Sequence, residues 1–248
     1  MTAPRILLID VETAPLLGFT WGVHEQDVIE VVRPWHLFSF AYRWLDSGKT
    51  NVIALSDYQI PYKRDPHCDK ILCEILWSLL DEATHVVAHH ARFDITKIRT
   101  RLLVHGFKPP SPFVVMDTLA WARKYFGFSS NRLDALCQEL NLGRKLSHTG
   151  KHLWLGCYNG DLKSWHRMKR YNKHDVDLLH ALFIRLRGWA KSPRLDYYTR
   201  TEGLTCPTCQ SSNIVKHGWD YLKSGKKQRI TCRDCGARPN VGPVIRVA

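Results

Sequence analysis

Two carboxylates, Asp10 and Glu12, follow an apolar run in the segment Arg5–Thr13. Alternate residues of a β-strand point to the same face, so both carboxylates lie on one side of the expected strand. Two like charges this close repel each other unless cations lie between them. The pair therefore predicts a metal site at the end of a buried strand.

Two further segments carry residues that can complete such a site. The segment His89–Asp94 follows the short apolar run Val86–Ala88, and Tyr171 and Asp175 lie in a stretch with helical periodicity. A spacing of four residues places Tyr171 and Asp175 on the same face of a helix. Four carboxylates and one phenol from three distant segments are thus expected to converge.

These segments resemble the motifs of the DEDD superfamily of 3′-to-5′ exonucleases. Asp10 and Glu12 match its first motif, Asp-x-Glu, and Phe93 and Asp94 match the aromatic-Asp end of its second. The second motif usually begins with Asn four residues before the aromatic. His89 stands there in this chain, which is a departure from the family pattern, although His can also form hydrogen bonds.

The third motif indicates the branch of the superfamily. One branch has His five residues before the last Asp, and the other has Tyr four residues before it. Position 170 is Arg and position 171 is Tyr, so the chain resembles the Tyr branch. The resemblance covers roughly residues 5 to 190. It is closest to stand-alone, often phage-encoded members related to the exonuclease domains of B-family DNA polymerases.

The resemblance implies a two-metal phosphodiesterase with a ribonuclease H-like fold. Asp10 would bridge two Mg²⁺ or Mn²⁺ ions, and Glu12 and Asp175 would help hold the ion that activates water. Asp94 would serve the second ion, partly through water, and Tyr171 would orient the attacking water. Nucleoside 5′-monophosphates would then leave from a 3′ end, most simply of single-stranded DNA, with RNA as the nearest alternative.

Other polar and aromatic residues near these motifs allow two interpretations each. Asp117 is expected to cap a helix, with metal ligation as the alternative. His89 and His90 either touch substrate or hydrogen-bond to the backbone. Core packing is the first expectation for three tryptophans, and base stacking is the alternative for one of them. They are Trp154, Trp165 and Trp189.

The C-terminal region carries two Cys-x-x-Cys pairs, which supply the four thiolates that structural zinc prefers. They are Cys206, Cys209, Cys232 and Cys235. The pattern resembles the zinc ribbons of transposases and phage DNA-handling proteins, with strands at 214–221 and 228–231 joined at Ser224-Gly225. His217 is a weaker candidate ligand, and disulfides are the alternative. The other four cysteines show no matched spacing and are expected to be thiols in or near the core.

The balance of charge predicts a polyanionic partner. The chain has 36 Lys and Arg against 23 Asp and Glu, a net charge of +13, and a pI near 9.5. Nucleic acid is the simplest such partner, and a replication or polymerase partner is also open. Backbone phosphate contacts are expected for a basic cluster near the C-terminal hairpin, with a solvated turn as the alternative. The cluster is Lys223, Lys226, Lys227, Arg229 and Arg233.

The elements that must position these residues follow from periodicity. Strands are expected at 5–10, 27–32, 36–45, 50–56, 86–88 and 113–116, and helices at 69–80, 95–105, 118–126, 131–141 and 164–189. Early antiparallel strands followed by alternating strands and helices favour an α/β, ribonuclease H-like mixed sheet flanked by helices. This domain is expected at 1–192, a linker at 193–204 and a zinc ribbon at 205–248.

The composition limits the remaining classes. A chain of 248 residues and 28.8 kDa can hold one ordinary domain and a small appendage but not a polymerase as well. No apolar stretch approaches the ~20 residues of a transmembrane helix, and no signal-peptide pattern precedes the first strand. An intracellular, cytoplasmic protein is expected. A non-catalytic nucleic-acid-binding protein on a nuclease scaffold and a transposase-like enzyme are the alternatives.

Overall fold

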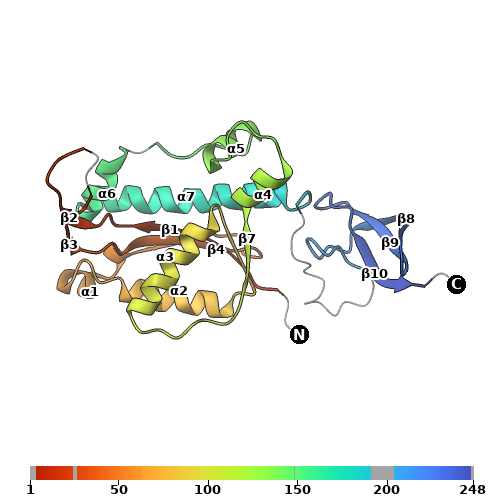
Figure 1. Cartoon of the computed structure of the whole chain (residues 1–248), viewed down its shortest axis with the longest axis horizontal. Helices are drawn as coiled ribbons and strands as arrows, with labels where there is room; N and C mark the ends of the chain where they lie inside the picture. The colour runs from red at the N-terminus through yellow and green to blue at the C-terminus, as the bar shows by residue number, and fades with distance from the viewer. Residues whose placement is uncertain (1–3, 25–26, 148, 191–203, 247–248) are drawn as a thin grey trace.

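The computed structural model describes residues 4–24, 27–147, 149–190 and 204–246 of the chain. These residues form a larger α/β part up to residue 190 and a smaller all-β part from residue 204 (Figure 1). The linker expected at 193–204 falls almost wholly outside the described ranges. Among the described residues, no helix combines the length and the apolar character needed to cross a bilayer.

The larger part is built on a five-stranded mixed sheet with the order β5-β4-β1-β6-β7. Its strands are β1 (Ile6–Thr13), β4 (Leu37–Trp44), β5 (Asn51–Ala54), β6 (His85–Ala88) and β7 (Val114–Asp117). β1, β4 and β5 are antiparallel neighbours, whereas β6 and β7 run parallel to β1. The expected mixed α/β architecture is confirmed, and the arrangement is compatible with a ribonuclease H-like fold.

Helices cover both faces of this sheet (Figure 1). α2 (Lys70–Glu82) and α3 (Ala91–Val104) pack on one face, and α7 (Leu162–Leu186) runs along the other. α7 is thus the long element that crosses the strands carrying the predicted site. The other helices are α1 (Gln59–Arg64), α4 (Thr118–Tyr125), α5 (Leu133–Glu139), α6 (Lys151–Tyr158) and the short 3-10 helix η1 (Leu55–Asp57).

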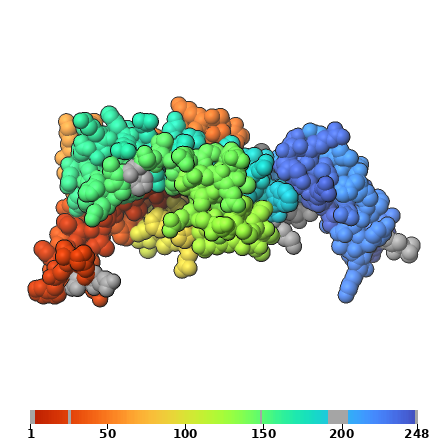
Figure 2. Space-filling view, turned by 90° about the horizontal axis from the view of Figure 1, so that it is seen from above, coloured from red at the N-terminus to blue at the C-terminus, as the bar shows by residue number. Residues whose placement is uncertain are grey.

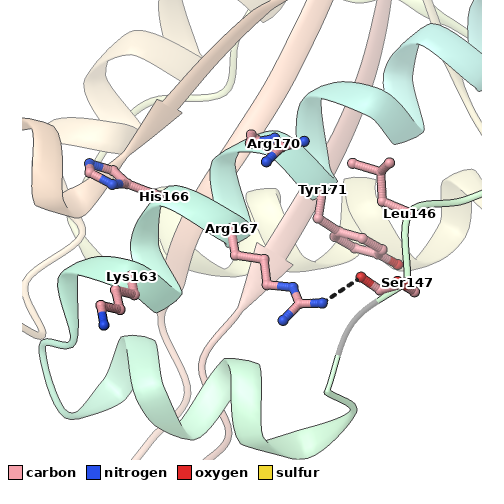
Figure 3. Close-up of a pocket in the computed structure, with 7 residues that line it drawn as sticks. All are labelled: Leu146, Ser147, Lys163, His166, Arg167, Arg170 and Tyr171. Carbon is pink, nitrogen blue, oxygen red and sulfur yellow. Dashed lines mark hydrogen bonds between the residues drawn. The ribbon is translucent and has the colours of Figure 1, made fainter.

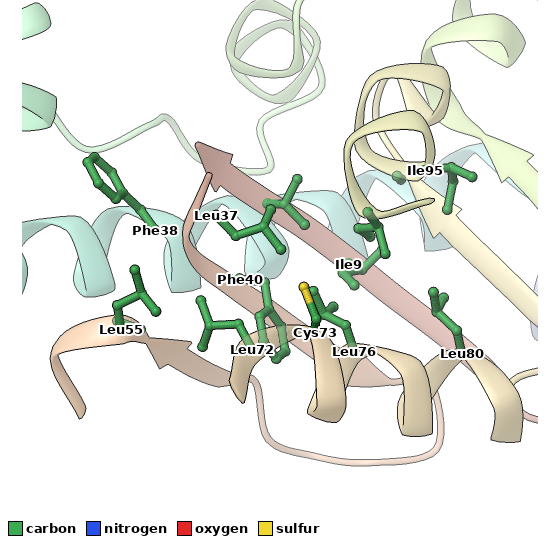
Figure 4. Close-up of a cluster of buried hydrophobic side chains, with 14 of the residues drawn as sticks. Ile9, Leu37, Phe38, Phe40, Leu55, Leu72, Cys73, Leu76, Leu80 and Ile95 are labelled. Atoms are coloured by element: carbon green, nitrogen blue, oxygen red, sulfur yellow. The ribbon is translucent and has the colours of Figure 1, made fainter. Parts of the chain in front are cut away.

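β1 lies between two hydrophobic cores because its apolar side chains alternate. Ile9 belongs to the core formed with the leucines of α2 (Figure 4). Leu8 belongs to the second core, which includes Leu179 of α7. Asp10 and Glu12 continue the alternation of Leu8, so they share its face of the sheet, the face that α7 covers.

Three of the four strands expected before residue 60 form the antiparallel half of the sheet as β1, β4 and β5. The fourth, expected at 27–32, is β3 (Glu30–Arg33), which pairs with β2 (Leu17–Phe19) and does not join the meander. This hairpin projects from the body of the protein (Figure 2, red). Its apolar residues face solvent, as Val31 at 53% and Val32 at 50% exposure illustrate, so the strand expected at 27–32 does not face the core.

The helices expected at 69–80, 118–126, 131–141 and 164–189 are present as α2, α4, α5 and α7, with small differences at their ends. The expected helix at 95–105 is α3, but it begins at Ala91. The earlier start places Asp94 within the first turn of the helix. The sequence pattern predicts neither α1 nor α6.

The smaller part is a three-stranded antiparallel sheet of β8 (Ile214–Leu222), β9 (Gly225–Cys232) and β10 (Asn240–Ile245). The expected hairpin is present, but Leu222 pairs with Gly225, so the turn itself is Lys223-Ser224. β10 is an additional strand on the other side of β9. The buried core of this part is small and includes the cysteines Cys206 and Cys232.

A buried ionic network links three elements of the larger part. It lies on the face of the sheet opposite α7. Asp69, which has no exposed surface, binds Arg101 of α3 through two hydrogen bonds of 2.8 and 2.7 Å. The same carboxylate accepts from the backbone N–H of Leu37 at 2.7 Å and contacts His105 Nε2 at 2.6 Å. Asp69 therefore joins the start of α2, the start of β4 and the end of α3.

Asp69→Asn is expected to destabilise the protein by about 3–5 kcal/mol, because it leaves the buried guanidinium of Arg101 without its counterion. Burial alone would raise the pKa of Asp69, but hydrogen bonds from Arg101, Leu37 and His105 outweigh it and hold the pKa below its usual 3.8. Its stabilising contribution is therefore present above pH ~4 and is lost as the pH falls further. Urea unfolding at several pH values measures both effects.

The matched control is Asp46→Asn, which removes the exposed ion pair of Asp46 with Arg5. Exposed pairs contribute roughly 0–1 kcal/mol, so this variant should unfold close to wild type. Equal stability losses in the two variants would contradict the role given to the Asp69 network.

Candidate active site and cysteine cluster

Asp10 and Glu12 at the end of β1 meet Asp175 of α7. One carboxylate oxygen from each residue lies within 4.8 Å of the other two. Strand alternation places the first two carboxylates on the face that α7 covers, and the register of the helix turns Asp175 toward them. Asp175 is buried, whereas Asp10 and Glu12 keep partial exposure, so the group opens to solvent on one side.

Asp94 lies beside this group and is held by the strand that supplies it. Its Oδ1 accepts a hydrogen bond from the backbone N–H of Val11 at 3.1 Å, and its side chain is buried. Burial and the charge of Asp10 raise the pKa of Asp94, which shows that the two carboxylates interact. The four predicted acidic residues therefore meet in one region, three of them as a single group.

Two residues that the sequence patterns did not single out for such a role orient these carboxylates. The side-chain amide of Asn172 donates to Asp10 Oδ2 at 2.6 Å, and Ser39 Oγ donates to the oxygen of the same amide at 3.0 Å. Trp154 Nε1 donates to Glu12 Oε2 at 3.1 Å. Each bond fixes one carboxylate oxygen, so the free oxygens point in defined directions.

Lys145 is a further unexpected member of the site. Its ammonium donates to Asp175 Oδ2 at 2.6 Å and to the hydroxyl of Tyr171 at 3.1 Å. Burial lowers the pKa of Lys145, but the nearby Asp175 and Tyr171 raise it more, so the ammonium stays charged. Lys145 lies in the loop before α6, and no motif or spacing in the sequence connects it with α7.

The acidic group is strongly repulsive. Burial, followed by the charge of Asp175, raises the pKa of Asp10 to about 7. Burial and the charge of Asp10 likewise raise the pKa of Glu12 well above its usual value. Burial also raises the pKa of Asp175 despite the neighbouring ammonium of Lys145. Carboxyl groups whose pKa values are raised by burial and by neighbouring charges are typical of functional sites.

Tyr171 stands at the edge of this group, one helical turn before Asp175. Its ring is buried, and it lies edge-on to the ring of Trp154 with centroids 6.1 Å apart. Burial and the charge of Asp175 raise the pKa of its phenol above 10. The phenol is therefore protonated at neutral pH and can donate a hydrogen bond, but it cannot act as a base.

Asp117 is a helix cap, as the first of its two interpretations predicted. Its carboxylate accepts from the backbone N–H groups of Leu119 and Ala120 at the start of α4. It also accepts from the backbone N–H groups of His90 and Ala91, which lead into α3. One carboxylate thus closes the N-terminal ends of two helices, and it lies outside the acidic group.

His89 forms internal hydrogen bonds. Its ring nitrogens lie 2.9 Å from Thr118 Oγ1 and 3.0 Å from the backbone oxygen of Asn131. Burial lowers the pKa of His89 to about 4, so its imidazole is neutral at physiological pH. The backbone alternative is therefore borne out for His89, which joins the second motif to α4 and to the loop before α5.

The aromatic residues that were expected to pack in the core differ in their burial. Core packing is confirmed for Trp165, which is 1% exposed, and is wrong for Trp189, which is 77% exposed at the end of α7. Trp154 is half-buried and contacts the site through Glu12. Phe93 is 42% exposed and stacks beside His90, so it packs against the site only in part.

The four cysteines of the C-terminal part form a second candidate metal centre. Their sulfur atoms all lie within 4.8 Å of one another. The Sγ atoms of Cys206 and Cys235 are 3.7 Å apart, and those of Cys209 and Cys232 are 3.6 Å apart. A tetrahedral Zn–S distance of ≈ 2.3 Å places sulfurs about 3.8 Å apart, so the arrangement fits zinc. His217 is not a member of this group.

The remaining cysteines are free thiols, as expected. Burial raises the pKa of three of them, so they are not reactive thiolates at neutral pH. They are Cys73, Cys137 and Cys157. Cys68 is partly exposed and also free.

The five basic residues of the C-terminal hairpin do not share one surface. Lys223 lies in the turn, and Lys226, Lys227 and Arg229 lie on β9, where alternation turns Lys226 away from the other two. Lys226 packs 4.9 Å from the ring centroid of Trp219, and Arg233 follows the end of β9. The three fully exposed members are Lys223, Arg229 and Arg233.

The donor sets fit the metals that the sequence suggests. Asp175 Oδ1 is buried and has no hydrogen-bond partner among the described residues, which leaves it free to ligate a cation. Hard carboxylate oxygens suit Mg²⁺ or Mn²⁺, and four thiolates suit Zn²⁺. In comparisons with known proteins, no protein-family model and no curated protein matched the chain.

Proposed function

We propose that this protein is a metal-dependent 3′-to-5′ exonuclease that acts on single-stranded DNA and carries a C-terminal zinc ribbon. The observation that carries the proposal is the meeting of Asp10, Glu12 and Asp175, with Asp94 beside them. Three separate segments bring these carboxylates to one solvent-accessible place. Tyr171 lies at its edge, as the Tyr branch of DEDD exonucleases requires.

The strand arrangement supports the same proposal. Without the β2–β3 hairpin, the sheet has three antiparallel strands in sequence order, followed by two parallel strands beside β1. This order is compatible with a ribonuclease H-like sheet. Such enzymes place their first carboxylate on the central strand, which is where Asp10 lies.

Different residues of the chain would have different roles in phosphodiester hydrolysis. Asp10, Glu12, Asp94 and Asp175 would hold two divalent cations, which neutralise charge developing on phosphorus and activate water. Asn172 and Trp154 hold two of these carboxylates in position.

Tyr171 would complete this arrangement at the reacting phosphate. Lys145 donates to the hydroxyl of Tyr171 and fixes its position, and this phenol, which interacts with Asp175, would orient the attacking water. Water would add to phosphorus as the bond to the 3′ oxygen breaks. The products would be a nucleoside 5′-monophosphate and a strand one residue shorter.

The test is degradation of 5′-labelled DNA and RNA oligonucleotides with Mg²⁺ or Mn²⁺. A ladder that shortens one nucleotide at a time from the 3′ end is expected, with DNA degraded faster than RNA. If RNA is degraded faster than DNA, the protein is an exoribonuclease and the assignment to DNA is wrong. Nicking of closed circular plasmid without end degradation would contradict exonuclease action.

The position of Lys145 favours one competing function, that of a non-catalytic nucleic-acid-binding protein. Its ammonium already neutralises part of the acidic group through Asp175. A protein that uses this lysine in place of divalent cations would not bind Mn²⁺. Calorimetric titration of Mn²⁺ into the purified protein distinguishes the two, because the nuclease must give a binding isotherm and the competitor must not.

The ribbon is expected to add affinity for nucleic acid through phosphate contacts that do not depend on sequence. Replacing Lys223, Arg229 and Arg233 by Ala removes the three exposed side chains of the predicted basic cluster. The slope of log K against log salt for a single strand should then decrease by about 2, because each phosphate contact contributes roughly 0.7. Fluorescence anisotropy with a labelled oligonucleotide measures this slope.

A matched control removes three exposed basic residues elsewhere, Lys63, Arg64 and Lys70 of α1 and α2. It changes the net charge equally and should change the slope much less. Equal slopes in the ribbon variant and wild type would exclude the ribbon from substrate binding.

A further inference from the structure

A cationic pocket lies directly beside Tyr171. It has a volume of about 500 Å³ and lies between α7 and the segment that contains Leu146 and Ser147. Figure 3 shows Tyr171 at one end of the pocket and basic side chains of α7 along it. These side chains are Lys163, His166, Arg167 and Arg170.

The basic residues follow one stripe of α7. Lys163, Arg167 and Arg170 are spaced by four and three residues, so they lie on the same helix face, and Tyr171 follows Arg167 by four. With a rise of 1.5 Å per residue, the stripe from Lys163 to Tyr171 is about 12 Å long. It therefore leads from the surface to the acidic group.

The charges of this stripe are not neutralised by the protein. Among the described residues, Lys163, Arg167 and Arg170 form no ion pair, and all three are exposed. Lys169 of the same helix, by contrast, pairs with Asp57 at 2.6 Å. Arg167 uses one guanidinium nitrogen to donate to the backbone oxygen of Ser147 at 3.0 Å, which leaves most of its donors available.

The wall opposite α7 is fixed in place. His174 Nε2 lies 2.9 Å from the backbone oxygen of Arg144, Lys145 binds Asp175, and Arg167 binds the backbone of Ser147. The segment from 144 to 147 is thus bound to α7 at three successive points. The pocket is formed before any ligand arrives, and a preformed site loses less entropy when it binds.

We propose that this pocket binds backbone phosphates of the substrate strand next to the phosphate that reacts. The inference rests on the proposed function and adds a strand path to it. Arg presents several donors in a fixed plane that matches phosphate oxygens, and unpaired cations attract a polyanion. The acidic group repels the strand when no cation is bound, so a nearby cationic stripe is needed to hold it.

The test is binding of a 5′-labelled single-stranded oligonucleotide to the full zinc-loaded chain without added Mg²⁺ or Mn²⁺, where no hydrolysis occurs. Arg167→Ala/Arg170→Ala should raise Kd roughly tenfold or more for each guanidinium lost. It should also reduce the salt slope by about 1.4. In the nuclease assay, KM should rise with little change in kcat.

Two controls separate phosphate binding from folding. Arg185→Ala removes the same side chain from the same helix about 21 Å beyond Tyr171 and should leave Kd unchanged. Arg167→Lys/Arg170→Lys lacks the planar donors of Arg and should regain only part of the affinity, but it keeps both charges and should restore the salt slope. Failure of the Lys variant to restore it, with an unchanged melting temperature, would overturn charge as the cause and with it the proposal.

The outcomes also distinguish this inference from the nuclease proposal. Oligonucleotide binding that depends on the two arginines, in a protein that degrades nothing, supports the pocket and refutes only the nuclease. Degradation with unchanged Kd and KM in the Arg167→Ala/Arg170→Ala variant overturns the pocket and leaves the nuclease intact. The same variant could instead bind the strand with unchanged Kd but be inhibited less by a nucleoside 5′-monophosphate. That result would show that the pocket binds the product and would overturn the proposal.

Discussion

Asp10→Asn is expected to lower the rate of nucleotide release at least about a thousandfold, because metal-ion catalysis supplies several kcal/mol of transition-state stabilisation. Asp10 belongs to the group of three carboxylates, and its charge also raises the pKa of Asp94. An amide carries no charge and holds Mg²⁺ or Mn²⁺ poorly. Single-turnover degradation of a 5′-labelled strand measures the loss.

The same substitution should make the metal-free protein more stable. Burial and Asp175 raise the pKa of Asp10 to about 7, so ionising this carboxyl opposes folding above that pH. The Asn side chain removes the charge and keeps an oxygen that can accept from the amide of Asn172. At pH 8 without added Mg²⁺ or Mn²⁺, the melting temperature should rise by roughly 2–4 °C for each kcal/mol of repulsion relieved.

The sign of the pH dependence follows from the raised pKa. A carboxyl whose pKa is higher in the folded state lowers stability as the pH rises from its usual pKa of 3.8 to about 7, and the full loss remains above that pH. The difference between Asp10→Asn and wild type should therefore be largest above pH 7 and disappear below pH ~4. Added Mn²⁺ should reverse the order by stabilising wild type more than the variant.

Glu74→Gln is the matched control, because it neutralises an exposed carboxylate on α2 outside the site. It should retain activity and melt close to wild type without added Mg²⁺ or Mn²⁺. A metal-free Asp10→Asn protein that is less stable than wild type at pH 8 would contradict the repulsion described for the acidic group. Full activity in that variant would remove Asp10 from the reaction.

The parts of the site that follow local periodicity could be predicted from the sequence. Asp10 and Glu12 share a face because strand residues alternate, and Tyr171 and Asp175 share a face because four residues make about one helical turn. Both statements need only neighbouring residues. The order of apolar segments likewise predicted α2, α7 and the central strands.

The supporting residues could not be predicted in this way, because their roles depend on contacts between distant segments. Lys145 reaches Asp175 and Tyr171 from a loop, and Trp154 reaches Glu12 across 142 positions of the chain. Asn172 lies on α7 between two residues of the predicted motif, but only the position of β1 shows what it binds. None of these contacts leaves a local pattern.

The start of α3 differs from the expected one for the same reason. His90 adopts a left-handed backbone with φ 72, which is unfavourable for a residue with a side chain. Asp117, 27 residues further along, accepts from the N–H groups of His90 and Ala91 and stabilises this turn. A local pattern cannot reveal a cap that comes from another strand.

Removal of zinc is expected to unfold the C-terminal part while α7 and the sheet stay folded. Only a few side chains are buried between β8, β9 and β10, so the hydrophobic core is too small to maintain the fold alone. Structural zinc in such sites contributes about 10–16 kcal/mol at neutral pH. Elemental analysis should find about one zinc ion per chain, and a strong chelator should expose the region after residue 204 to protease.

Cys232→Ser should reproduce the effect of the chelator, because it removes one buried ligand from β9. Cys68→Ser is the matched control, since Cys68 is a partly exposed thiol outside the cluster, and it should retain zinc and resist protease. The distinction rests on cooperativity, because two thiolates precede β8 and two lie at and after the end of β9, so the ion links these two segments. A zinc-free chain whose C-terminal part still resists protease would show that its strands fold without the metal.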